Sequence, residues 1–163
     1  MLELLLLRHG EAALTSPDHN RQLTAGGIAQ TQQVLNQRSD CLEGLTACYV
    51  SPLVRARQTA QLVSEQLVKQ RTAETPLPTE FEVCDGLQPE CSVDALIEWL
   101  QPQQGRVLLV AHNPLLTLLL NQLHDSGRRA QRHHFTTSTL ACLSMPIAAS
   151  GCAEINWITH PTA

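Results

Sequence analysis

The chain has 163 residues, of which 43% are hydrophobic and 16% charged, and its formal net charge at pH 7 is −4. This length is typical of one domain with its own core, so we expect residues 1–163 to form a single domain, and the composition excludes a disordered tail or a coiled coil. Aromatic residues make up 3%, which argues against base-stacking platforms, and the acidic balance argues against a nucleic-acid or anionic-membrane partner.

Short apolar runs alternate along the chain with segments of helical periodicity. The runs at 2–7 and 106–111 carry few polar residues, which is typical of strands buried on both faces. In chain order we expect strand 2–7, a polar loop, helix 25–38, strand 45–50, a helix from Ser51-Pro52, a turn-rich linker over 71–78, strand 81–84, a helix after Ser92, strand 106–111, helix 115–123, and closing strands over 139–145 and 153–158. Strands separated by helices predict a three-layer α/β/α sandwich with a mostly parallel central sheet.

Capping residues indicate where the helices begin. Thr24 and Ser92 are N-cap candidates, and Ser51-Pro52 is typical of an N-cap followed by the first residue of a helix. Pro114 suits the first position of the last helix. Gly26-Gly27 weakens the first turn of the helix over 25–38.

The six cysteines form no Cys-x-x-Cys pair, and the first residues lack the basic segment and apolar run of a signal peptide. We therefore expect a soluble, cytoplasmic protein whose free thiols fill core space, with a zinc site as the less favoured alternative because of the spacings. No stretch approaches the ~20 apolar residues that span a bilayer, so no membrane association is expected.

Polar groups follow three of the predicted strands. Arg8 and His9 follow the first strand, Arg55 lies in the first turn of the helix after the second, and His112 follows the strand over 106–111. Because ligands of an open parallel sheet bind beyond the carboxyl ends of its strands, we expect these four side chains at one edge, beside the N-termini of two helices. Such a site is suited to a dianion, most simply a phosphoryl group.

Three sequence blocks stand at these strand ends: Leu7-Arg8-His9-Gly10-Glu11, Ser51-Pro52-Leu53-Val54-Arg55-Ala56-Arg57-Gln58-Thr59-Ala60 and Val110-Ala111-His112-Asn113-Pro114. In this order they resemble the histidine phosphatase (phosphoglycerate-mutase-like) superfamily. The Arg-His-Gly triplet alone is a weak signal, whereas three blocks at three strand ends are specific. The short chain and the segment Phe135-Thr136-Thr137-Ser138 resemble the SixA-type phosphohistidine phosphatase branch. The resemblance covers nearly the whole chain.

The resemblance implies that His9 attacks phosphorus and forms a covalent phosphohistidine intermediate, while Arg8, Arg55 and His112 bind the phosphoryl group. A neutral imidazole is a good nucleophile near pH 7, provided that a backbone carbonyl holds its other nitrogen. Two guanidinium groups and one imidazolium can meet the charge on the equatorial oxygens without Mg²⁺. We therefore expect no metal and no cofactor.

The sequence departs from the family pattern at the general acid. Many members place a Glu after the second-strand helix, and the corresponding position here is Gly86. Asp85 is one residue away, and Glu82 and Glu90 are further candidates. Loss of the acid costs about 10²–10⁴-fold when an alkoxide must leave, whereas phosphohistidine expels imidazole, a better leaving group. The missing Glu and the lack of a long inserted lid favour phosphohistidine on a folded protein.

Other polar residues near these blocks have a structural interpretation beside the functional one. Glu11 and Asn113 are candidates for substrate binding, although a solvated loop accounts equally well for Glu11. Arg57 is expected to point elsewhere on its helix, and Gln58-Thr59 to support the fold. The basic stretch 127–134 is either a solvated turn or a surface that steers an acidic phosphocarrier protein.

The sequence thus predicts a monomeric, metal-independent hydrolase that removes phosphate from phosphohistidine in a protein. Its partner would be a histidine phosphocarrier or phosphotransfer domain, and its product inorganic phosphate. A small-molecule phosphomonoesterase or mutase is the alternative within enzymes. A non-catalytic module that recognises phosphate and a metal-binding structural protein are the alternatives outside enzymes.

Overall fold

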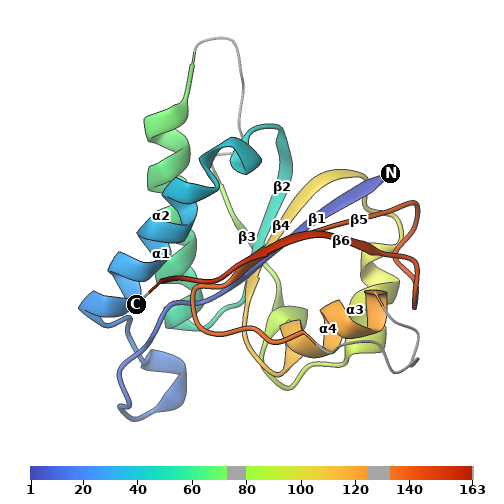
Figure 1. The fold of residues 1–163 in the computed structure, drawn as a ribbon. Helices are drawn as coiled ribbons and strands as arrows, with labels where there is room; N and C mark the ends of the chain where they lie inside the picture. The colour runs from blue at the N-terminus through green and yellow to red at the C-terminus, as the bar shows by residue number, and fades with distance from the viewer. Residues whose placement is uncertain (73–79, 125–132, 163) are drawn as a thin grey trace.

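The computed structural model describes residues 1–72, 80–124 and 133–162. Within them, a six-stranded sheet with the order β3-β2-β4-β1-β5-β6 lies between helices (Figure 1). The strands are β1 (Leu2–Arg8), β2 (Leu45–Val50), β3 (Glu82–Val83), β4 (Gly105–Ala111), β5 (Leu140–Met145) and β6 (Glu154–Thr159). The α-helices are α1 (Ala25–Gln37), α2 (Val54–Gln70), α3 (Val93–Leu100) and α4 (Leu115–His124), and short 3-10 turns include η1 (Asp18–Asn20), η2 (Ser39–Leu42) and η3 (Asp85–Leu87).

The sheet is parallel at its centre and antiparallel at one side. β4 pairs in parallel with β1 and β2, and β2 pairs in parallel with β3. β5 runs antiparallel to β1, and β6 antiparallel to β5. The predicted mostly parallel sheet is therefore confirmed.

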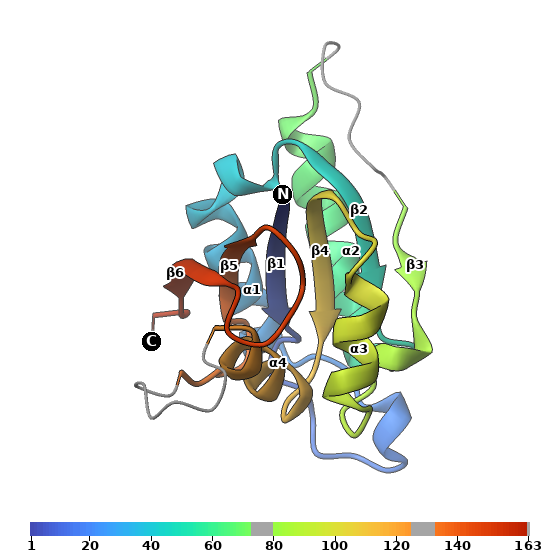
Figure 2. The same ribbon diagram turned by 90° about the vertical axis from the view of Figure 1, so that its right-hand side faces the viewer.

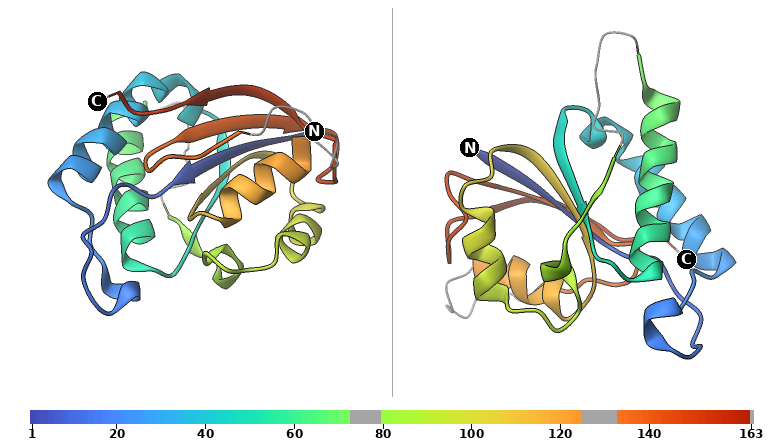
Figure 3. Two further views of the ribbon diagram at one scale, coloured as in Figure 1. Left: turned by 60° about the horizontal axis from the view of Figure 1, so that its bottom comes forward. Right: turned by 180° about the vertical axis from the view of Figure 1, so that it is seen from behind.

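Helices cover both faces of the sheet, with α1 and α2 on one side and α3 and α4 on the other (Figures 2 and 3). Successive side chains of β1 point to opposite faces. Leu4 and Leu6 join the apolar cluster under α3 and α4, and Leu5 and Leu7 join the cluster under α1 and α2. An apolar run without alternation is thus explained by burial on both faces, and the predicted three-layer α/β/α sandwich is confirmed.

The carboxyl ends of β1, β2 and β4 meet at one edge because these strands run in parallel and in register. Arg8 lies opposite Ala111, and Val50 lies opposite Val110. The residue after each strand remains tied to the sheet: the backbone N–H of His9 donates to Ala111 O at 3.0 Å, and that of Ser51 donates to Val110 O at 3.1 Å. This register places the ends of three predicted sequence blocks side by side.

Two of the predicted helix caps are confirmed, and one is wrong. The side chains of Thr24 and Ser92 accept hydrogen bonds at the first turns of α1 and α3. α2 begins at Val54 after Leu53 as N-cap, rather than at Ser51-Pro52. Ser51 precedes the helix because it continues from β2 into the protein interior, where it is fully buried.

All six cysteines are free, but only Cys48 and Cys142 are buried, so the expectation that the thiols fill core space is only partly correct. Cys152 is exposed. No helix in the described part of the chain is long and apolar enough to cross a membrane. Most of the predicted linker 71–78 and of the basic stretch 127–134 lies outside the described residues.

Candidate active site

His9 lies directly after β1, and its side chain is almost fully buried. Its Nδ1 is 2.7 Å from the carbonyl oxygen of Gly10. A carbonyl can only accept, so Nδ1 carries the ring hydrogen and Nε2 keeps its lone pair, as the sequence analysis expected for a nucleophile. Burial, together with the positive charges of Arg55 and Arg8, lowers the pKa of His9 to about 4. The imidazole is therefore neutral at pH 7.

His112 follows β4, and its ring centroid lies 5.0 Å from that of His9. Its Nε2 is 2.7 Å from Ser51 Oγ. Burial, together with neighbouring His9 and Arg55, lowers the pKa of His112 to about 3. The imidazolium expected from the sequence is therefore wrong for pH 7: His112 is a neutral imidazole, because burial removes the water that would solvate its charge.

The two arginines converge on this edge from different elements. Arg8, at the end of β1, donates from Nη1 to the carbonyl oxygen of Phe135 at 2.9 Å. Arg55, in the first turn of α2, donates from Nη1 to Asp18 O at 2.9 Å and from Nη2 to Asp18 Oδ2 at 3.3 Å. Burial, followed by the charge of Arg55, lowers the pKa of Arg8 below its ordinary value.

Three buried nitrogens of this cluster have no hydrogen-bond partner in the described structure. They are Arg8 Nε, Arg55 Nε and His112 Nδ1, and no other buried side-chain nitrogen or oxygen in the described residues lacks a partner. Leaving a buried donor unpaired costs about 1–3 kcal/mol. Their concentration beside His9 is the electrostatic signature of an anion-binding site.

Hydrogen bonds from distant elements hold the segment that carries His9. Gly10 N donates to Thr59 Oγ1 at 3.1 Å, and Ser138 N donates to His9 O at 3.1 Å. Ser138 has a φ of 62°, in the left-handed region. Thr59 thus supports the fold, as does Gln58, whose Oε1 accepts from Leu23 N at 2.7 Å. The role of Ser138 was not predicted, although it belongs to the Phe135–Ser138 segment that carries the resemblance.

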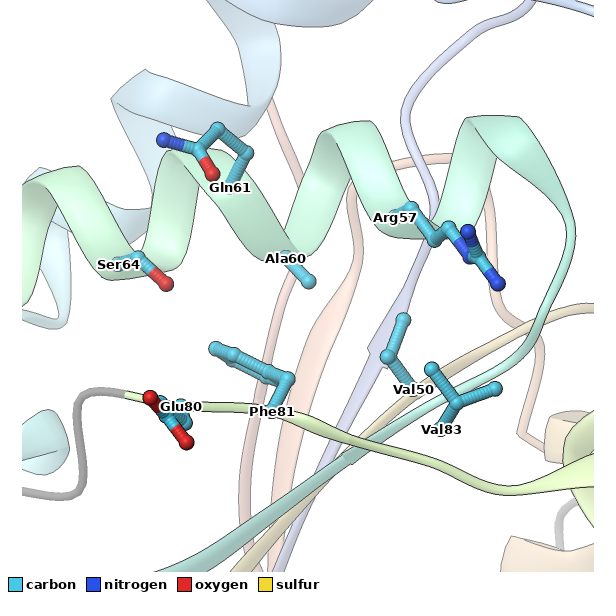
Figure 4. A pocket seen from close by; sticks show the side chains of 8 residues that line it. All are labelled: Val50, Arg57, Ala60, Gln61, Ser64, Glu80, Phe81 and Val83. Carbon is cyan, nitrogen blue, oxygen red and sulfur yellow. The ribbon is translucent and has the colours of Figure 1, made fainter.

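Arg57 points away from the cluster, as predicted from its place on the helix. It lines a separate pocket between α2 and β3, together with Phe81 and Val83 (Figure 4). Arg55 and Arg57 therefore face different parts of the surface, although they are two residues apart. This makes Arg57 a matched control for Arg55.

Glu11 and Asn113, which were predicted to bind substrate beside Arg8, Arg55 and His112, both make hydrogen bonds at helix starts. Glu11 Oε1 accepts from Thr24 Oγ1, the N-cap residue of α1, at 2.8 Å, and its substrate-binding role stays a prediction. Asn113 Oδ1 accepts from Thr117 N at 3.3 Å, and its Nδ2 donates to Phe135 O at 2.9 Å. Asn113 does line the groove, so a contact with substrate remains open to it.

A groove of about 650 Å³ runs past Arg55, and its lining includes two acidic residues, Asp18 and Glu90. Asp85 and Glu82 do not line it. Of the three candidates for a general acid, Glu90 alone lines this groove, and the assignment of the acid stays a prediction. In the described chain no group of three His, Cys, Asp or Glu side chains could hold a metal ion.

Asp18 was missed by the sequence analysis. It lies on η1, in the polar loop after His9, and the bond from Arg21, then the nearby Arg55, lowers the pKa of its carboxyl. The carboxylate is therefore ionised at pH 7 and competes for Arg55. An acidic residue in the loop after the nucleophile is the signal that could have marked it.

Comparison of the sequence with known proteins finds similarity to the histidine phosphatases. Residues 4–91 match the sequence model of the histidine phosphatase superfamily (branch 1). The chain is 29% identical over 165 residues to phosphohistidine phosphatase SixA of Escherichia coli strain K12, an alignment that covers 98% of this chain and 94% of that protein. It is 31% identical over 120 residues to an uncharacterised protein of Picosynechococcus sp., covering 69% and 67% of the two chains.

Solved structures agree with these sequence matches. The protein histidine phosphatase SixA complexed with tungstate superposes with a TM-score of 0.80 at 28% identity, covering 98% of this chain and 97% of that one. A second structure, from Nakamurella multipartitia, has a TM-score of 0.75 at 22% identity and covers 99% and 96% of the two chains. The latter likeness concerns the fold alone.

Proposed function

The chain belongs to the histidine phosphatase superfamily (branch 1) and to its SixA-type branch, and we propose that it removes phosphate from phosphohistidine in a partner protein through a covalent intermediate on His9. One observation carries the proposal: three buried nitrogens of Arg8, Arg55 and His112, and Nε2 of the neutral His9, have no hydrogen-bond partner among the residues that the structure describes. The partner would be a histidine phosphocarrier or phosphotransfer domain. Residues 1–163 would act as one domain and as a monomer.

The reaction has two displacement steps at phosphorus. The Nε2 lone pair of His9 forms a bond to phosphorus as the bond to the substrate's imidazole nitrogen breaks, and that nitrogen keeps the electron pair and takes a proton from solvent. Water then attacks the phosphoryl group on His9 and gives up a proton. Inorganic phosphate leaves, and His9 recovers its lone pair.

The negative charge on the oxygens of the transferred phosphoryl group is stabilised by side chains that the fold already holds in place. The guanidinium groups of Arg8 and Arg55 carry positive charge, and their anchors at Phe135 and Asp18 restrict their motion. His112, as a neutral imidazole, would donate a further hydrogen bond to the phosphoryl oxygens. Fixed donors need no reorganisation in the transition state. We propose on this basis that the enzyme needs no metal ion.

Replacement of His9 tests the nucleophile. Phosphate release from a histidine-phosphorylated protein should vanish in His9→Ala. It should fall by about 10²–10³-fold in Arg55→Ala, which removes a preorganised donor. Arg57→Ala should retain the parent rate, because that side chain lines another pocket. Turnover by His9→Ala would contradict the mechanism, and tight phosphate binding without any turnover would favour a recognition module.

A small-molecule phosphomonoesterase is the second candidate, because Glu90 lines the groove beside Arg55. An alkoxide leaving group needs an acid, whereas imidazole needs little help. Glu90→Gln should therefore leave phosphohistidine turnover within about threefold, with Asp85→Asn as the control outside the groove. An enzyme that prefers alkyl phosphates and loses that activity in Glu90→Gln alone would move the assignment to small molecules.

A further inference from the structure

Ser51 is a buried hydroxyl that the reaction described above does not use. Its side chain is fully buried at the end of β2, and the residue's N–H is tied to Val110 O. Its Oγ lies 2.7 Å from Nε2 of His112 and accepts from Leu53 N at 3.4 Å. The question is which of the two partners, Ser51 or His112, supplies the proton between them.

The hydrogen bonds of Ser51 answer this question. The oxygen already accepts from a backbone N–H, and its own hydrogen has His112 Nε2 as its acceptor among the bonds of the described residues. If Nε2 carried the ring hydrogen instead, the buried hydroxyl hydrogen would have no acceptor there. An unsatisfied buried donor is costly, so Ser51 donates and Nε2 accepts.

This assignment determines where the hydrogen of His112 lies. A neutral imidazole has one N–H, so an accepting Nε2 leaves the hydrogen on Nδ1. Nδ1 is the atom that is buried and unpartnered, in a ring 5.0 Å from His9. The opposite tautomer would present a lone pair to an anionic oxygen and repel it.

We propose that Ser51 is a positioning residue that holds His112 as the Nδ1–H tautomer, so that a neutral His112 donates to a phosphoryl oxygen. The inference rests on the proposed function for the identity of the anion. Burial and the groups that face His112 keep its pKa low: Arg8 at the end of β1, His9 directly after it and Arg55 from α2 lower the pKa, and Asp18 from η1 raises it. Because the ring is neutral, the choice of tautomer decides whether it attracts or repels the anion.

The direct test needs no variant. Histidine labelled with ¹⁵N should show, in a two-bond ¹H–¹⁵N correlation spectrum at pH 7, a protonated Nδ1 and an unprotonated Nε2 for His112. The His112→Gln variant identifies the signals. A wild-type ring with its hydrogen on Nε2 overturns the proposal.

Substitution of Ser51 tests whether the hydroxyl is responsible. In Ser51→Ala the tautomers should mix, and inorganic phosphate measured by calorimetry should bind about three- to tenfold more weakly, since only the Nδ1–H fraction is competent to bind. Ser51→Thr, which keeps a hydroxyl, should restore both readouts. Ser64→Ala, which changes a residue in the separate pocket between α2 and β3 (Figure 4), should change neither.

An unchanged tautomer and unchanged phosphate affinity in Ser51→Ala would overturn the role of Ser51. If Ser51→Ala does not fold, the wild-type and Ser51→Thr spectra still decide the question. These readouts use inorganic phosphate and need no phosphoprotein. A failure to dephosphorylate phosphohistidine would therefore refute the proposed function and leave the tautomer result standing.

Discussion

Asp18 shows how a single residue can compete with the ligand of a site. Its backbone oxygen and its carboxylate both accept from Arg55, so the guanidinium is held by one permanent contact and one that an anion can replace. The carboxylate itself is largely exposed, with 65% of its side chain accessible. An exposed ion pair of this kind contributes little, which makes displacement by phosphate inexpensive.

The Asp18→Asn variant should bind inorganic phosphate more tightly, by about two- to fivefold, because a negative charge is removed beside Arg55 while the backbone contact remains. Calorimetric titration at low ionic strength would measure the change. Asp85→Asn removes a carboxylate outside the groove and should leave the affinity unchanged. Weaker binding in Asp18→Asn would mean that the carboxylate organises Arg55 for the anion.

At the scale of elements, the start of α1 is packed directly against the chain that follows His9. A Cβ placed on Gly27 would lie 2.2 Å from Glu11 O and 2.8 Å from Glu11 N, and one on Gly10 would lie 2.8 Å from Gly27 O. All three distances are too short for a side chain. The glycine that weakens the helix in isolation is therefore required where helix and loop touch.

Gly27→Ala should lower the free energy of unfolding by about 2 kcal/mol or more, since backbone must move to admit the methyl group. Gly26→Ala is the matched control, because the nearest atoms to its added Cβ are 3.8 Å or farther away. That change should raise stability by up to about 1 kcal/mol through helix propensity. Denaturant unfolding measures both, and equal effects of the two substitutions would refute the close-contact account.

At the scale of the whole molecule, folding moves two histidines from water into the core. Their pKa values fall from the ordinary 6.5 to about 4 for His9 and about 3 for His112, mainly through burial. Between these values and 6.5 the unfolded chain binds protons that the folded protein does not. The free energy of unfolding therefore rises with pH across this window. The contribution of the two neutral histidines to it reaches its full value only above about pH 6.5.

We expect stability to fall by several kcal/mol as pH drops from 7 to 4, since each unit of pKa difference corresponds to about 1.4 kcal/mol. Denaturant unfolding at a series of pH values would measure the slope. In the double variant His9→Gln, His112→Gln the slope should be shallower, because neither side chain titrates. An unchanged slope in the double variant would show that other groups cause the acid sensitivity.

Local patterns in the sequence predict most of the architecture of this fold. The strand and helix order, the parallel centre of the sheet and the meeting of Arg8, His9, Arg55 and His112 at one edge were all predicted. Such features follow from periodicity and from the position of residues at strand ends, which are properties of short stretches of chain.

Only the tertiary structure determined the side-chain contacts and the protonation state of His112 in the site. The contact of Ser51 with His112 joins residues 61 apart, and that of Asp18 with Arg55 joins residues 37 apart. Neither contact leaves a pattern along the chain. The neutral state of His112 and the placement of Glu90 rather than Asp85 in the groove depend on burial and on the path of the backbone, which arise only when distant elements pack together.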